Sequence, residues 1–283
     1  MDNSNTKKQI GKLDPVLLIK LLEKYSKELN ILKWDVGASS SKDISVQVQQ
    51  GNSKQLKGSQ RNSLTLRVWN NNKVGITSTS DLTNEGIKKA INGAIEASIF
   101  GNEKESPEFS PLSKSPIKEI TYKHNKEHGI NELLTILKYA EKKLIDTHKS
   151  IDSVPYNGLS ESYIERLYIN SEGANRYMKI SQSSIYLYAK AQEDNKKPRS
   201  AGGVRIHSNL EELDIDSCIK ETSNKLISHL NYQSIKTKKY LICFSPEAFL
   251  QLITAFSSMF NARSIIDGLS LMNEESIGKK IAV

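Results

Sequence analysis

The chain has 283 residues and a mass of 31.7 kDa, which is long enough for two domains or for one large domain. Hydrophobic residues make up 37 % of it and charged residues 25 %, so a packed core is expected, and no run of about 18 apolar residues exists that would predict a membrane span. The net charge is +8, but the lysines come as scattered pairs, which does not favour nucleic-acid binding because phosphate affinity needs several cations on one surface.

The N-terminal part of the chain is predicted to begin with a disordered segment and one helix. Residues 1–13 are expected to be disordered, and because no apolar segment follows their lysines, they do not resemble a secretory signal. Asp14 and Pro15 are typical of a helix start, with a side-chain acceptor at the N-cap and proline at the first helical position. The helix is expected to end near Asn30.

An antiparallel sheet of three or four strands is predicted next, over residues 34–79. Ile44 to Val48 alternates apolar and polar side chains, as does the segment from Leu64 to Trp69. Turns are expected at Gly51-Asn52 and at Asn70 to Asn72, because asparagine tolerates the left-handed backbone conformation.

A second helix is predicted from Thr83 to Ile99, with Thr83 as its N-cap. Leu82 can pack on Ile87 across the helix start, and Gly101 suits the position just after the helix. Residues 101–118 are rich in serine, proline, glutamate and lysine, which indicates a surface connection between structured parts.

The second half repeats this plan, so that a helix–sheet–helix arrangement is expected twice. Its predicted elements are a helix over 131–148, strands over 163–169 and 177–191, a polar loop over 192–203, a strand over 204–206 and a helix over 216–230. The fold class expected is therefore α+β, with antiparallel β-sheets covered by helices.

A domain boundary is expected near residue 237. Residues 14–236 would form an N-terminal α+β domain, and 237–283 would begin a second, β-rich domain. Tyr240 to Phe244 is predicted to be a short apolar strand. Ser245 and Pro246 predict a helix start, and capping by Ser245 accounts for that serine without a nucleophilic role.

One pattern of metal-binding type occurs, formed by His124, Glu127 and His128. It is formally H-x-x-E-H, in which both histidines would bind zinc and the glutamate would assist the metal-bound water. The surrounding sequence favours a solvated loop or helix start instead, because Gly129 follows at once and no apolar stripe anchors the segment. A stand-alone metallopeptidase built on these residues remains one alternative.

The other histidines and the cysteines suggest no reactive site. His148, His207 and His229 lie far apart in the sequence and are expected near the surface. Cys243 is expected to be buried in its apolar strand, and Cys218 to be structural, because no basic partner for it is identifiable. Two such cysteines do not suggest a disulfide framework, which predicts a reduced, cytoplasmic setting.

Two further segments stand out without forming a catalytic arrangement. Thr79, Ser80 and Asp81 combine hydroxyl groups with a carboxylate, but no histidine is near them, and closing a strand and satisfying a helix start is a sufficient role. The polar loop that contains Arg199, Gly202 and Gly203 joins charge to flexibility, which is consistent with a peptide or partner contact.

Four segments, in order and in approximate spacing, resemble the TldD/PmbA family, whose members are also called modulators of DNA gyrase. The most specific is the GITSTSDL that ends the first of them. The segments are SQRNSLTLRVWNNNKVGITSTSDL at 59–82, INSEGA at 169–174, RSAGG at 199–203 and CFSPEAFLQL at 243–252.

The resemblance implies a role in a zinc-dependent peptidase. One branch of the family carries a zinc-binding H-E-x-x-x-H helix, and this sequence lacks that motif, so it resembles the TldE/PmbA branch. The implied function is that of a cytoplasmic subunit of a TldD–TldE metallopeptidase that degrades or trims small unfolded peptides. Zinc would be held by the TldD-like partner, and the chain itself would bind no cofactor.

The resemblance also implies that the second domain is shortened, because family members continue well past the match to residues 277–280. A homodimer in place of the heterodimer, and a nucleic-acid or gyrase-associated binding protein, are alternatives that the sequence leaves open.

Overall fold

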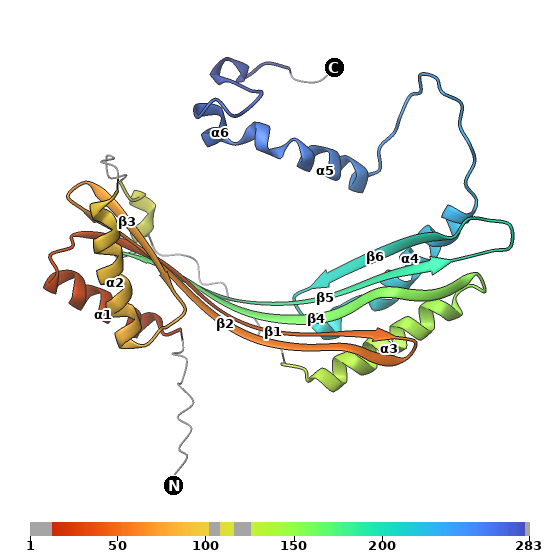
Figure 1. Cartoon of the computed structure of the whole chain (residues 1–283), viewed down its shortest axis with the longest axis horizontal. Helices are drawn as coiled ribbons and strands as arrows, with labels where there is room; N and C mark the ends of the chain where they lie inside the picture. The colour runs from red at the N-terminus through yellow and green to blue at the C-terminus, as the bar shows by residue number, and fades with distance from the viewer. Residues whose placement is uncertain (1–12, 102–107, 116–125, 281–283) are drawn as a thin grey trace, which may run out of the picture. The chain divides into compact units, whose positions relative to one another are not determined.

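The computed structural model describes residues 13–101, 108–115 and 126–280, which belong to two units, residues 1–232 and 233–283. Figure 1 shows the elements along the chain. The helices are α1 (Pro15–Glu28), α2 (Asn84–Ile99), α3 (Ile130–Asp146), α4 (Ile215–Leu230), α5 (Pro246–Ala255) and α6 (Ala262–Ile266). The strands are β1 (Lys33–Gln49), β2 (Asn52–Asn70), β3 (Lys73–Thr79), β4 (Ile151–Asn170), β5 (Asn175–Ala191) and β6 (Arg199–His207). Short 3-10 helices are η1 (Pro111–Lys114), η2 (Leu210–Glu212), η3 (Ser257–Phe260) and η4 (Glu274–Ser276).

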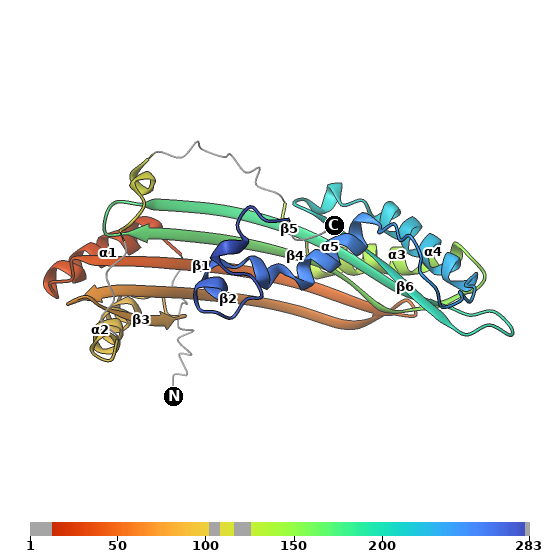
Figure 2. The same ribbon diagram turned by 90° about the horizontal axis from the view of Figure 1, so that it is seen from above.

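The first unit is built on one antiparallel sheet in the order β3-β2-β1-β4-β5-β6 (Figure 2). The predicted α+β class and antiparallel strands are confirmed, but the two expected helix–sheet–helix units share a single sheet. Their junction is the pairing of β1 with β4, which runs from Asp35 opposite Asn170 to Val46 opposite Leu159. The two halves of the sequence are therefore joined by backbone hydrogen bonds between strands far apart in the chain.

The strands are longer than predicted because their central parts are polar. The strand expected around Ile44 to Val48 extends over Lys33–Gln49, and the strand expected over 163–169 extends over Ile151–Asn170. Serine-rich stretches such as Ser39 to Ser41 lack the apolar alternation that reveals a half-buried strand, and yet they complete the ladder.

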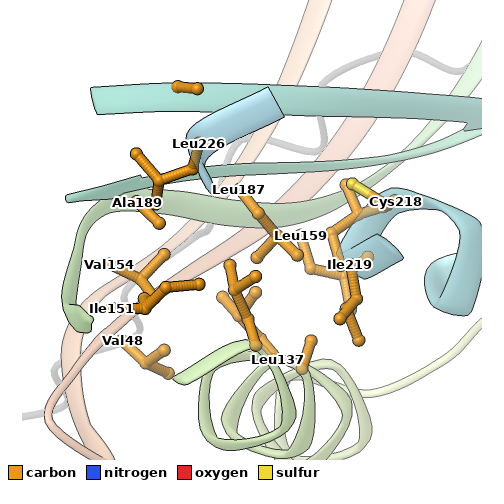
Figure 3. Packing of buried hydrophobic residues seen from close by; sticks show 14 of the residues in the cluster. Val48, Leu137, Ile151, Val154, Leu159, Leu187, Ala189, Cys218, Ile219 and Leu226 are labelled. Atoms are coloured by element: carbon orange, nitrogen blue, oxygen red, sulfur yellow. The ribbon is translucent and has the colours of Figure 1, made fainter. Parts of the chain in front are cut away.

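All four helices of the first unit that pack on the sheet lie on the same face, over two separate hydrophobic clusters. One cluster joins α1 and α2 to β1, β2 and β4, and includes Leu22, Leu66 and Ile91. The other joins α3 and α4 to the opposite end of the sheet, and includes Leu137 and Leu187. Figure 3 shows the second cluster, where side chains from α3, α4 and the strands meet. Burial at both ends fixes which face of each strand is covered.

The predicted N-caps and the asparagine turn are confirmed, whereas the turn predicted at Gly51-Asn52 lies one residue earlier, at Gln50 and Gly51, because Asn52 begins β2. Asp14 accepts hydrogen bonds from the backbone N–H groups of Val16 (3.0 Å) and Leu17 (3.1 Å), as expected of an N-cap. Asn71 and Asn72 have φ values of 50° and 60°, so the turn between β2 and β3 uses the left-handed conformation predicted for asparagine.

Three expectations about local structure were wrong or lie outside the described residues. Residues 240–244 form no strand, because no strand of the described residues pairs with them. Residues 199–203 belong to β6, so the loop after β5 is shorter than predicted. Leu13 is buried with 2 % exposure rather than disordered, and residues 1–12 lie outside the described part of the chain.

The described middle of the predicted linker is held against the sheet. The ring of Phe109 meets that of Trp69 edge to face, with 5.7 Å between centroids. The guanidinium group of Arg176 donates to the carbonyls of Leu112 (3.0 Å) and Ser113 (2.8 Å). The segment therefore crosses one end of the sheet, and the rest of the predicted linker, 102–107 and 116–118, lies outside the described residues.

The second unit is helical in its described part. Ser245 accepts a hydrogen bond from the backbone N–H of Ala248 (3.3 Å), so the predicted N-cap of α5 is confirmed. Neither α5 nor α6 buries a residue. No helix among the described residues of either unit is both long and apolar enough to cross a membrane.

Candidate functional site

The structure separates the residues of the H-x-x-E-H pattern. Glu127 is exposed and pairs with Lys42 on β1, whereas His128, directly before α3, is buried. His124 lies outside the described residues. The burial of His128 corrects the expectation that this segment is solvated. His128 is buried because it binds a carboxylate on a strand of the sheet.

That carboxylate is Glu161 on β4, which sequence reasoning missed. Nδ1 of His128 lies 2.9 Å from Oε1 of Glu161, and since a carboxylate only accepts, this nitrogen is the donor. The backbone N–H of His128 donates to Oε2 (3.2 Å), and the Ser183 hydroxyl donates to Oε1 (3.4 Å). The side chains of His128 and Glu161 are 6 % and 4 % exposed. We call His128, Glu161 and Ser183 the buried cluster.

Two further side chains, those of Tyr163 and Glu211, lie close to the buried cluster. Burial, followed by the negative charge of Glu161, raises the pKa of Tyr163 to about 12, so its hydroxyl stays protonated and donates to the Lys126 carbonyl (3.0 Å). Nε2 of His128 is 3.9 Å from the exposed carboxylate of Glu211. Because both oxygens of Glu161 accept hydrogen bonds, the cluster fixes the start of α3 to the sheet.

The described side chains do not fit a bound metal ion. Across residues 13–101, 108–115 and 126–280, no three histidine, cysteine, aspartate or glutamate side chains are grouped so that they could hold one. His148 and His207 are half-buried and His229 is exposed, each with its own hydrogen bond to a nearby backbone group. The structure therefore gives no donor set through which a metal-dependent step could be derived.

The GITSTSDL segment builds the connection from β3 to α2. The Thr83 hydroxyl accepts from the backbone N–H of Gly86 (3.2 Å) and donates to Oδ1 of Asp81 (2.6 Å). The Thr79 hydroxyl accepts from the backbone N–H of Asp81 (3.0 Å), while Ser80 between them is exposed. These hydroxyl and carboxylate groups satisfy backbone donors at a helix start, which is a structural role.

Replacing Thr83 with alanine is expected to lower the free energy of unfolding by about 1 kcal/mol, because the N-cap acceptor of α2 is lost. Urea denaturation followed by circular dichroism measures the change. Thr83→Ser keeps the hydroxyl and is the matched control, with a stability close to that of the unchanged chain. Equal losses in both variants would contradict the capping role.

The glycines of the RSAGG segment allow close packing within β6. A Cβ at Gly202 would lie 2.7 Å from the Leu187 carbonyl oxygen and from the ring of Tyr188. A Cβ at Gly203 would lie 2.9 Å from the hydroxyl of Thr222 on α4. Arg199, at the start of the strand, has its guanidinium carbon 3.9 Å from the ring centroid of Tyr232. Arg199, Gly202 and Gly203 were predicted to lie in a flexible loop. The structure places them in β6, where neighbouring atoms approach so closely that only glycine fits at positions 202 and 203.

The two cysteines differ in environment. Cys218 on α4 is buried, and this burial raises the pKa of its thiol to about 11. Cys243 is exposed, which corrects the expectation that it is buried, because the segment around it forms no paired strand.

A brief treatment with iodoacetamide at about pH 8 is expected to alkylate Cys243 and to spare Cys218, because only the thiolate reacts and burial disfavours it. Mass spectrometry of the digested chain identifies the modified residue. Unfolding in urea should make both thiols reactive, and the Cys243→Ser variant should show no fast-reacting thiol. Rapid alkylation of Cys218 in the folded chain would contradict the structure.

The sheet face opposite α1–α4, which we call the open face, carries a second group of functional candidates. It is formed by odd-numbered residues of β1 (35–47) and β2 (55–69) and by even-numbered residues of β3 (74–78), β4 (156–168), β5 (176–190) and β6 (200–206). Within the first unit, the only described segment that crosses it is 108–115, at one end. Tyr186 and Tyr188 alternate with apolar residues along β5, but the face as a whole emerges only from the register of all the strands.

The centre of the open face is polar, and the side chain of Asp43 holds several of its polar groups together by hydrogen bonds. Its carboxylate accepts hydrogen bonds from Ser162 (2.7 Å), Ser41 (3.2 Å) and Arg61 (3.3 Å). Burial alone would raise the pKa of Asp43, but these hydrogen bonds outweigh it and hold the pKa below its usual value. Asp43 is therefore ionised at neutral pH, with its charge largely compensated by its neighbours.

The two ends of the open face are aromatic. At one end, Arg67 binds Asp35 through two nitrogens, and its guanidinium carbon is 5.3 Å from the ring centroid of Trp69. At the other end, the rings of Tyr156 and Tyr188 are 6.2 Å apart, and Tyr186 accepts a hydrogen bond from Gln47 (2.9 Å).

Comparison with known proteins identifies relatives over most of the chain. Three family models match: PmbA/TldA metallopeptidase domain 1 over residues 34–98, the central domain over 123–230 and the C-terminal domain over 237–283. No curated protein sequence matches the chain.

Solved structures with a similar fold include three proteins of low sequence identity. A protein named as a modulator of a DNA gyrase from Thermotoga maritima is 18 % identical, with a TM-score of 0.79 over 92 % of this chain and 58 % of its own. A modulator of DNA gyrase from Bacteroides thetaiotaomicron is 14 % identical, with a TM-score of 0.73 over 89 % of this chain and 58 % of its own. TldE from Thermococcus kodakarensis is 16 % identical, with a TM-score of 0.65 over 74 % of this chain and 47 % of its own. The chain thus covers between 47 % and 58 % of the length of these proteins.

Proposed function

Because the chain belongs to the PmbA/TldD family of metallopeptidases, we propose that it is a TldE-like subunit of a peptidase complex whose zinc is held by a TldD-like partner. The observation that carries the proposal is the combination of family domains with an unsuitable donor set. The sequence has no H-E-x-x-x-H motif, and the described residues group no three metal-ligating side chains. The similarity in fold to a protein named TldE supports the same branch.

The proposed complex acts on small unfolded peptides in the cytoplasm. Both cysteines are free thiols, which is consistent with a reducing compartment. In this proposal the chain contributes surface for the partner and for the peptide, while the partner contributes the hydrolytic metal. Because metal-bound water is the usual nucleophile in such peptidases, the chain alone is proposed to be inactive.

Association with a TldD-type protein tests the proposal. The chain is mixed with a zinc-loaded TldD-type partner, and size-exclusion chromatography with light scattering measures the mass of the product. A stable heterodimer is expected, and it should contain one zinc ion for each TldD-type subunit. An unrelated zinc peptidase of similar size serves as the control. Failure of the two chains to associate at micromolar concentrations would count against the proposed role.

The stand-alone alternative based on His124, Glu127 and His128 is not favoured by the geometry. Glu127 pairs with Lys42 at the surface, while Nδ1 of His128 is held by Glu161 on β4, so these two side chains of the pattern are engaged in separate contacts. The nucleic-acid alternative is less favoured than the subunit role, since most cations of the open face are engaged in contacts of their own, such as Arg67 with Asp35.

A further inference from the structure

We propose that the open face binds an extended peptide that carries both an acidic and an apolar side chain. The proposal rests on the peptide-handling role above and specifies where this chain would hold the peptide and what kind of peptide it would prefer. Three features of the face lead to it: an aromatic patch that is exposed among the described residues, an excess of cations, and a length that suits a peptide in extended conformation.

The aromatic patch lies where β4, β5 and β6 run side by side. Tyr156 stands opposite Tyr188, and Tyr186 stands opposite Val204. We call Tyr156, Tyr186, Tyr188, Val204 and Ile206 the tyrosine patch; their exposed fractions are 65, 37, 42, 55 and 62 %. Large apolar side chains that are grouped and exposed on a sheet face are typical of interaction surfaces, and tyrosine is enriched in them.

Two glycines shape this patch. A Cβ at position 158 would lie 2.4 Å from the ring of Tyr186, and a Cβ at position 202 would lie 2.7 Å from the ring of Tyr188. The rings therefore lie close against the backbone of the neighbouring strands. The rings are therefore held on the sheet itself, where an apolar side chain of a bound peptide can contact them.

The charge of the open face favours an acidic occupant. Its cations outnumber its carboxylates, which are Asp35 and Asp43 together with Asp152 at its edge, where Asp152 pairs with Lys190. The cations are Lys57, Arg61, Arg67, Arg166, Arg176 and Lys190. The side chains of Lys57 and Arg166 are exposed and form no ion pair or hydrogen bond with any described residue. They are available for the carboxylates of a bound partner.

The spacing on the sheet suits a short extended peptide. Along β4, Arg166 lies opposite Ser39, and position 158 lies opposite Tyr186. Since a strand rises by about 3.3 Å per residue, the positions 158 and 166 are about 26 Å apart, which about eight residues of extended chain span. Serine hydroxyls such as those of Ser160 and Ser184 line the interval and can bond to peptide groups.

A single-stranded nucleic acid could also stack on tyrosines, but the charges do not favour it. Phosphate backbones need several converging unpaired cations. Arg61 and Arg67 are engaged by aspartates, and Arg176 by carbonyl oxygens of the crossing segment 108–115. The remaining pair of free cations matches the carboxylates of a peptide better than a continuous phosphate chain.

Fluorescence anisotropy with the whole isolated chain tests the proposal. The probe is a labelled peptide of about ten residues that contains glutamate and phenylalanine, and the comparison probe has lysine in place of glutamate. Arg166→Glu is expected to weaken binding of the glutamate peptide by about fivefold or more and to strengthen binding of the lysine peptide. Lys142→Glu, an exposed charge reversal on α3, is the matched control and should change neither affinity.

The aromatic contribution is tested in the same assay. Replacing Tyr156 and Tyr188 together with serine is expected to weaken binding of the glutamate peptide by about tenfold or more. Tyr139→Ser, which alters an exposed tyrosine on α3, should leave it unchanged. Circular dichroism establishes that each variant is folded, and Arg166→Glu remains informative if the double variant does not fold.

Three results would overturn the proposal. One is binding of the glutamate peptide that is equal in all folded variants. Another is displacement of the peptide by single-stranded DNA at lower concentration than by unlabelled peptide. The third is a dimer of the chain that dissociates in the double tyrosine variant while peptide binding is unchanged, which would assign the face to a second copy. Because no partner is present in the assay, failure of the TldD association leaves these readouts unaffected.

Discussion

Replacing Glu161 with alanine is expected to lower the free energy of unfolding by about 3 to 5 kcal/mol. The carboxylate accepts hydrogen bonds from the ring and the backbone N–H of His128 and from the hydroxyl of Ser183. Its removal leaves these donors buried without an acceptor, and each unsatisfied donor costs about 1–3 kcal/mol. Urea denaturation followed by circular dichroism gives the change from the shift in midpoint.

Glu165→Ala is the matched control for this prediction. Glu165 lies four residues further along the same face of β4 and pairs with Lys179 at 3.2 Å, but its side chain is 24 % exposed and that of Lys179 is 49 % exposed. A pair that is open to solvent contributes about 1 kcal/mol or less. Similar losses for Glu161→Ala and Glu165→Ala would show that the buried cluster does not anchor α3 to the sheet.

Gly75→Val is expected to destabilise the chain by about 3 kcal/mol or more. A Cβ at Gly75 would lie 1.7 Å from the Ala94 carbonyl oxygen and 2.6 Å from the Ser98 nitrogen, both backbone atoms of α2. Backbone atoms cannot rotate away, so α2 would have to leave β3, and the hydrophobic cluster beneath it would open. This contact accounts for the glycine that begins the GITSTSDL segment.

Gly58→Val is the control for the Gly75 variant. Gly58 is also a strand glycine, on β2, and a Cβ there would have no neighbour within 4 Å. Its replacement is expected to change stability by about 0.5 kcal/mol or less. Thermal unfolding of both variants distinguishes steric conflict at α2 from a general effect of altering a strand glycine, and equal melting temperatures would contradict the predicted packing.

Local features of the structure followed directly from the sequence. The N-caps Asp14, Thr83 and Ser245 were each predicted from the acceptor and the residues that follow it, and each accepts a backbone hydrogen bond. The asparagine turn at 70–72 was predicted for the same reason, since the determining chemistry lies within a few residues. The ranges predicted for α1 to α4 agree with the structure to within about two residues at each end.

Features that depend on distant residues could not be predicted in this way. The pairing of β1 with β4 joins positions more than a hundred residues apart and makes one sheet of two expected ones. Glu161 looks like an ordinary polar residue of a strand, and only the approach of His128 from the start of α3 makes it a buried acceptor. Gly202 and Gly203 were interpreted as loop residues, because nothing local reveals that Tyr188 and Thr222 press on them.

The candidate site shows the same division. The separate segments of the family resemblance were visible in the sequence, and the family models confirm the assignment. The open face was not visible, because it combines side chains from six strands whose register is set by hydrophobic clusters on the opposite face. The tyrosine patch in particular requires β4, β5 and β6 to be aligned before its members are neighbours.

The zinc content of the purified chain, measured together with peptide cleavage, tests the central claim most directly. After dialysis against a chelator and then against zinc-containing buffer, the account predicts far less than one zinc ion per chain and no cleavage of a labelled peptide. Cleavage should appear when a zinc-loaded TldD-type partner is added. One tightly held zinc ion per chain, with peptide cleavage in the absence of any partner, would contradict the account.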